Sequence, residues 1–138
     1  MLYSLQSKAL IINGCEIKPS TFCNDANLSE TDLSYLDLTD ASFKRADFID
    51  SFLVYADLTD VKFLSADLAN ADHSNATLIG TNFKRAELTN ADLSNANISN
   101  AFFKFTDLSG ADLTNIIGWE TANFNKASYT PQTLLPND

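Results

Sequence analysis

The sequence predicts an all-β solenoid with four flat sides, in which about 20 residues make one coil. Three observations lead to this fold class. Units of five residues follow one another without a break from Ala26 to Asn115, each unit alternates small and large apolar residues, and phenylalanine returns every 20 residues. This alternation is typical of extended chain, and it leaves no 3.6-residue period, so the pattern excludes an α-helix.

Each five-residue unit is expected to hold a short extended segment followed by a turn. In the unit Ala56-Asp57-Leu58-Thr59-Asp60, aspartate separates the alanine from the leucine, so both apolar side chains face the interior. The last two positions of the units are mostly Ser, Thr, Asn, Asp or Gly, which are turn formers. The chain should therefore turn a corner every five residues.

Four units make one coil, because the identity of the large inward residue repeats at that interval. Parallel stacking should separate successive coils by about 4.8 Å. Extending the phenylalanine series toward the two ends requires one extra residue near each end, which we assign to Asp25 and Ile116. The predicted core column is then Phe22, Phe43, Phe63, Phe83, Phe103 and Phe124.

The 138 residues are expected to form one domain with two short ends. The repeats are predicted over residues 10–131, with residues 1–9 as an N-terminal cap and 132–138 as a C-terminal cap or tail, for a total of about six coils. Trp119 and Tyr129 fall at inward positions of the closing coil. A packed interior of this kind should leave no ligand cavity.

The chain carries nine basic and 18 acidic residues, for a net charge of -9, so direct nucleic-acid binding is not expected. Residues 1–9 lack the apolar run of a signal peptide, and no later stretch is long and apolar enough to span a membrane. The expected location is cytoplasmic. In this frame Cys15 faces inward and Cys23 outward, which predicts two reduced thiols.

Several units carry the motif A(D/N)Lxx in tandem, and this motif resembles that of the pentapeptide-repeat family over residues 10–131. The clearest copies begin at Ala56, Ala66, Ala91 and Ala111. The resemblance implies a right-handed quadrilateral β-helix that is usually non-enzymatic. One subgroup of the family mimics B-form DNA with an acidic rod, binds DNA gyrase and confers fluoroquinolone resistance. Compared with that subgroup, this chain has no recognisable C-terminal dimerisation segment, no long loop and a shorter rod.

The charges are expected to divide the rod into one basic and three acidic sides. The phenylalanine side should carry no acid, and seven of the nine cations fall on it: Lys44, Arg45, Lys62, Lys84, Arg85, Lys104 and Lys126. On the next side an acidic column of Asp47, Asp67, Glu87 and Asp107 is expected. Such carboxylates either cap local backbone N–H groups at the turns or present a charged surface to a basic groove.

Exposed apolar residues mark the second kind of candidate site. Tyr35, Phe52, Val54 and Tyr55 are predicted to cluster on one outer face, and Phe102 and Phe105 lie on the phenylalanine side. Together with the cations Lys44, Arg45, Lys84, Arg85 and Lys104, the first group forms the predicted partner-binding surface.

The sequence offers little for catalysis. His73 is the single histidine, and it occupies an inward position that other units fill with Leu or Ile, so we expect a buried, hydrogen-bonded core histidine. No metal site, cofactor or catalytic residue is predicted, because a histidine-based dyad or metal cluster has too few members. The phosphate-binding and hydrolase motifs are also absent from the sequence.

These observations favour a non-enzymatic interaction module that presents charged, flat faces to a protein partner. Neither nucleic acid nor a membrane is an expected partner, and the rod should be a monomer or an end-to-end dimer. Two alternatives stay open. One is a DNA-mimicking modulator of DNA gyrase or another topoisomerase, and the other is a structural spacer or self-assembling unit.

Overall fold

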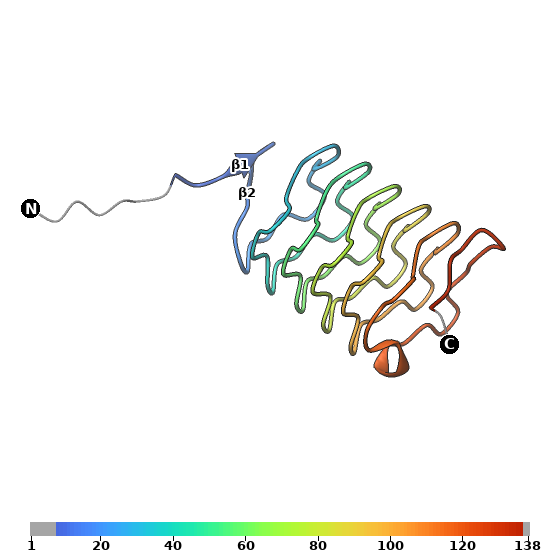
Figure 1. Cartoon of the computed structure of the whole chain (residues 1–138). Helices are drawn as coiled ribbons and strands as arrows, with labels where there is room; N and C mark the ends of the chain where they lie inside the picture. The colour runs from blue at the N-terminus through green and yellow to red at the C-terminus, as the bar shows by residue number, and fades with distance from the viewer. Residues whose placement is uncertain (1–7, 137–138) are drawn as a thin grey trace, which may run out of the picture.

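The computed structural model describes residues 8–136, which form a right-handed, four-sided β-helix (Figure 1). The predicted fold class is confirmed. Isolated parallel bridges join residues 20 positions apart, from the pair Phe22 and Ser42 to the pair Asn97 and Ile117. Each unit contributes one bridge and one turn, so the four-unit coil expected from the sequence is the repeating element of the rod.

The corners explain why the units end in turn formers. At each corner the last residue of the unit has a positive φ, for example 58° at Asp60 and 58° at Asn90. Asn, Asp and Gly tolerate this left-handed conformation better than other residues. The aspartate before the large apolar residue supports the same turn, because the Asp57 carboxylate accepts a hydrogen bond from the backbone N–H of Thr59 at 3.1 Å.

The core of the rod is built around a stack of aromatic rings. Phe43, Phe63, Phe83 and Phe103 are fully buried, and their ring centroids lie 5.7, 5.4 and 5.0 Å apart along the axis. Phe124 extends the stack, with its ring 4.8 Å from that of Phe103. Each coil thus buries its ring against the coils before and after it.

The predicted register is wrong at the N-terminal end, where Phe22 is 85% exposed and does not belong to the core. The five-residue frame continues unbroken to Thr21, so Phe22 occupies the outward position that bridges Ser42, and Cys23 takes the inward place. Asp25 is no insertion, because it is an ordinary corner residue with a φ of 61°.

The extra residue at the C-terminal end also lies elsewhere than predicted. Ile116 is buried and keeps its place in the five-residue frame. The offset between bridged residues changes from 20 to 21 only after Ile117, at the pair Phe102 and Asn123. The extra residue is accommodated by a 3-10 helix, η1 (Trp119–Thr121), which follows Gly118 at a φ of 79°. Trp119 and Tyr129, expected to face inward, line the end of the core with Leu113 and Phe124, and both side chains are largely exposed there.

A hairpin rather than regular coil precedes the repeats. Strands β1 (Ile11–Ile12) and β2 (Cys15–Glu16) pair antiparallel, and a disulfide joins Cys15 to Cys23. The prediction of two free thiols is therefore wrong, and the cause is the register, since Cys23 points inward toward Cys15. Disulfides are rare in reducing compartments, so this bond removes one argument for a cytoplasmic location.

Loss of the disulfide should destabilise the rod measurably. Its loop spans eight positions, and closing a loop of this length restricts the unfolded chain by about 2 to 3 kcal/mol. Reducing the wild type, or introducing Cys15→Ser together with Cys23→Ser, should lower the free energy of unfolding by this amount in denaturant titrations. Coincident unfolding curves for the oxidised and reduced protein would contradict the prediction.

Among the residues described, no helix is long and apolar enough to cross a membrane.

Candidate functional site

Bulky residues at the left-handed corners are the feature that singles out two surfaces. Residues 8–136 include 20 non-glycine residues with positive φ, of which thirteen are Asn, Asp or Ser. A bulky side chain in this conformation costs on the order of 1 kcal/mol. Six of the seven exceptions lie in two corner columns, and only Glu30 lies elsewhere. The six are Tyr35 and Tyr55 in one column, and Arg45, Arg85, Phe105 and Lys126 in the other.

The first surface, the aromatic corner, comprises Tyr35, Phe52, Val54 and Tyr55. The rings of Tyr35 and Tyr55 stack at 5.3 Å with an interplanar angle of 12°, although the residues are 74% and 55% exposed. Phe52 is also exposed, and it bridges Asp32 and Asp72 on the adjoining side. Val54 is half-buried, with its backbone N–H bonded to the Ser34 hydroxyl.

Carboxylates surround the aromatic corner. Asp37 and Asp57 bridge one another on the side that follows the two tyrosines, and Asp32 precedes them. The backbone N–H of Ser34 donates a hydrogen bond to Asp32 and holds the pKa of that carboxyl below its usual value. The aromatic rings therefore project from an acidic surface.

The second surface, the basic corner, comprises Arg85, Lys104, Phe105 and Lys126. The three cations approach the Phe105 ring, with the guanidinium carbon of Arg85 at 5.0 Å from its centroid and the Nζ atoms of Lys104 and Lys126 at 5.5 and 5.3 Å. These distances fall within the range of cation–π contacts.

Arg45 behaves differently from the basic corner. Its guanidinium forms a bidentate pair with Asp25 at 2.7 and 2.8 Å, and this bond holds the pKa of Asp25 below its usual value. The expectation that the phenylalanine side carries no acid is therefore wrong. Lys44 and Lys84, the other predicted contact cations, lie one position before Arg45 and Arg85 on the same side.

The acidic column is brought together as predicted. Asp47, Asp67, Glu87 and Asp107 bridge one another in succession along one side. Each of the three aspartates accepts a hydrogen bond from the backbone N–H two residues later, at 2.9 to 3.1 Å. The hydroxyl and backbone N–H of Ser109 also hold the pKa of Asp107 below its usual value. These carboxylates thus stabilise the turns while remaining on the surface.

His73 is buried as expected, but the expected hydrogen bonds are missing. Neither ring nitrogen has a hydrogen-bond partner, and the ring meets those of Phe63 and Phe83 edge to face at 6.3 and 6.2 Å. Burial lowers the pKa of His73 to about 4, and the Asp72 carboxylate and the Ala71 backbone oppose this shift. Within residues 8–136 no group of three or more His, Cys, Asp or Glu side chains could hold a metal ion.

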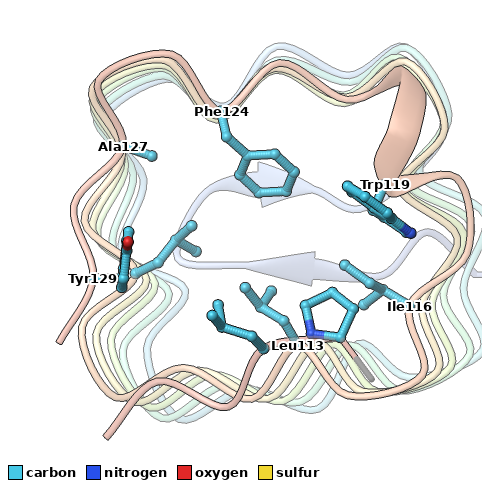
Figure 2. Close-up of a pocket in the computed structure, with 9 residues that line it drawn as sticks. Leu113, Ile116, Trp119, Phe124, Ala127 and Tyr129 are labelled. Carbon is cyan, nitrogen blue, oxygen red and sulfur yellow. The ribbon is translucent and has the colours of Figure 1, made fainter. Parts of the chain in front are cut away.

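The C-terminal end of the core is open, which the sequence did not lead us to expect. A hollow of about 310 Å³ lies where the inward side chains of a further coil would pack (Figure 2). Leu113 and Ile116 are among the buried residues that line it, and Trp119, Phe124 and Tyr129 surround it. The signal available in the sequence was the end of the regular repeats at Asn115, and Leu135 and Pro136 of the later segment also line the hollow.

A family model described as pentapeptide repeats matches three overlapping segments, residues 26–63, 63–101 and 78–115. The chain belongs to the pentapeptide-repeat family. The matched segments contain the whole acidic column and all four residues of the aromatic corner. Lys126 of the basic corner lies beyond them.

Several proteins of known structure are similar to this one. Rfr23 of the cyanobacterium Cyanothece 51142 is 21% identical, with 83% of this chain and 90% of that chain aligned and a TM-score of 0.80, so the two share a fold. A thylakoid-lumen protein of Arabidopsis thaliana is 31% identical over 68% of this chain and 66% of its own, with a TM-score of 0.36. QnrB1, a plasmid-mediated fluoroquinolone resistance protein, is 17% identical over 82% of each chain, with a TM-score of 0.31. No functionally curated protein matches the chain.

Proposed function

We propose that this pentapeptide-repeat protein is a non-enzymatic protein-binding module whose main contact surface is the aromatic corner. One observation carries the proposal. Tyr35 and Tyr55 adopt a left-handed conformation that disfavours bulky residues, and yet both rings are directed into solvent.

The other residues in the corner column of Tyr35 and Tyr55 show that the fold does not require an aromatic side chain there. Its later members are Asn75, Asn95 and Asn115, which adopt the conformation readily and leave no apolar surface exposed. Stacking of the two tyrosine rings returns only about 0.5 to 1.5 kcal/mol, which does not exceed the cost of placing both residues at left-handed corners. Contact with a partner offers a reason for tyrosine at these two corners, because tyrosine is enriched among the residues that dominate binding energy.

The surroundings favour a basic partner segment. A guanidinium group can stack on a tyrosine ring while it pairs with a nearby carboxylate. The aromatic corner provides both, because Asp32 and Asp37 lie within three residues of Tyr35, and Asp57 lies two residues after Tyr55. The net charge of -9 would also speed the approach of a cationic partner at low salt.

Two matched variants test the proposal in one capture experiment from cells that contain the protein. The first, Tyr35→Asn with Tyr55→Asn, copies the residues of later coils and should leave the fold intact. The second replaces the acidic column with Asp47→Asn, Asp67→Asn, Glu87→Gln and Asp107→Asn. A partner held by the wild type should bind the first variant at least about tenfold more weakly, as expected for the loss of two anchoring aromatic rings, and should retain the second.

The reverse pattern would instead support the DNA-mimic alternative. In that case binding depends on the acidic column, duplex DNA competes with the protein, and the affinity falls steeply with salt. A DNA gyrase supercoiling assay with the wild type and the acidic-column variant measures the same property directly. Modulation of supercoiling that disappears in this variant would replace our proposal.

End-to-end assembly is the second candidate, and the open hollow favours it. Trp119 and Tyr129 are exposed at the C-terminal end of the core, and Ile11 and Phe22 are exposed near the N-terminal end. A second copy could cover this apolar surface. Light scattering over a range of concentrations should then show dimers, and Trp119, the single tryptophan, should change its fluorescence on association.

The oxidation state of the two cysteines would test the predicted cytoplasmic location. A cytoplasmic protein should contain two free thiols at Cys15 and Cys23, whereas the disulfide should persist in an oxidising compartment. Alkylation of thiols before cell lysis, followed by mass spectrometry, distinguishes the two states.

A further inference from the structure

The basic corner gathers like charges around one aromatic ring. Arg85, Phe105 and Lys126 occupy equivalent left-handed corner positions in successive coils, and Lys104 directly precedes Phe105. All three cationic groups lie 5.0 to 5.5 Å from the centre of the same ring. The three positive charges thus share one aromatic ring as a neighbour, in a protein of net charge -9.

No acid neutralises this cluster. Within the described part of the chain the ion pairs are Lys18 with Glu16 and Arg45 with Asp25, so none involves Arg85, Lys104 or Lys126. The nearest acids along the chain, Glu87 and Asp107, begin the next side of the rod, and neither forms an ion pair with the cluster. Like charges gathered around one ring repel one another, so an anion that binds beside them would be stabilised.

We propose that the basic corner is a binding site for a phosphate group. A carboxylate is satisfied by a single guanidinium, as Asp25 is by Arg45. A phosphate monoester carries up to two negative charges and three terminal oxygens, which matches one guanidinium and two ammonium groups that approach from different positions. Arginine can bind two of these oxygens at once, and lysine contributes a point charge.

Phe105 has a distinct role at this site. It occupies a left-handed corner, with a φ of 59°, a conformation that most other corners of the rod give to Asn, Asp, Ser or Gly. Its ring attracts the guanidinium and both ammonium groups through cation–π contacts. The site goes beyond the proposed function, since it lies on a different corner of the rod and takes an anion rather than a basic segment.

Titration of the folded protein with phosphate-bearing probes tests the site. Isothermal titration calorimetry and amide chemical shifts would be measured at low ionic strength with inorganic pyrophosphate and with a phosphoserine peptide, and the unphosphorylated peptide is the control. Arg85→Gln with Lys126→Gln should weaken binding at least about tenfold, in line with the loss of two charge-assisted hydrogen bonds. Phe105→Asn, which suits the corner conformation, should weaken it by releasing the cations.

Arg45→Gln provides the matched control, because Arg45 occupies the same corner column but is already paired with Asp25. This variant should bind both probes as the wild type does. Binding of the peptide alone would identify a phosphorylated protein as the source of the phosphate, and binding of pyrophosphate alone would identify a free phosphate compound. Failure to bind either probe, or an equal loss in Arg45→Gln, would overturn the proposal.

Discussion

Replacing Phe63 with alanine should lower the free energy of unfolding by about 3 to 5 kcal/mol, the range found for large aromatic residues in well-packed cores. Its ring is fully buried between those of Phe43 and Phe83, at 5.7 and 5.4 Å, and it meets Phe48 edge to face at 5.2 Å. The neighbouring coils cannot close the gap, because the backbone ladder fixes their spacing. Guanidinium chloride titration followed by circular dichroism measures the loss.

Phe22→Ala is the control for this substitution, since it removes the same side chain from an exposed position. It should change the free energy of unfolding by less than about 0.5 kcal/mol. A loss as large as that of Phe63→Ala would place Phe22 in the core, as the phenylalanine spacing first suggested. The pair of variants therefore tests the register at the N-terminal end as well as the core packing.

The middle of the rod could be predicted from the sequence because each unit repeats the same local requirements. The apolar alternation and the corner residues are explicit in every unit from Ala26 to Asn115, and the 20-residue return of Phe43, Phe63, Phe83 and Phe103 sets the number of sides. The ends could not be predicted in the same way. The phenylalanine series favours Phe22 at the inward position, whereas the unbroken five-residue frame favours Cys23. The backbone hydrogen bond from Cys23 N–H to the Ser42 carbonyl continues the frame.

The sequence predicted the residues of the two candidate surfaces, but it predicted the contacts among those residues for only one of them. The phase of the repeat directs Phe52 outward and places Tyr35 and Tyr55 at equivalent positions 20 residues apart, so their proximity follows from the coil length. The repeat also places seven cations on one side. It does not show that Arg45 is paired with Asp25 while three other cations converge on Phe105, because those contacts depend on side-chain conformations.

Acidification should destabilise the rod through His73. The imidazole is fully buried without a hydrogen bond, and its pKa of about 4 in the folded state lies below the 6.5 of an unperturbed histidine. The unfolded chain therefore takes up a proton as the pH falls from 6.5 toward 4, and the folded chain does not. Stability is greatest above pH 6.5 and falls by about 3 kcal/mol down to pH 4, where both states become protonated.

His73→Leu should remove this dependence, because other coils place leucine at the same inward position, as at Leu53 and Leu93. The variant should also be more stable at pH 7 by about 1 to 3 kcal/mol, since it eliminates two buried polar atoms without partners. Denaturant titrations between pH 7 and 5 isolate the effect, because most carboxylates stay ionised in this window. Parallel pH profiles for the wild type and the variant would show that His73 is protonated, or reaches water, in the folded rod.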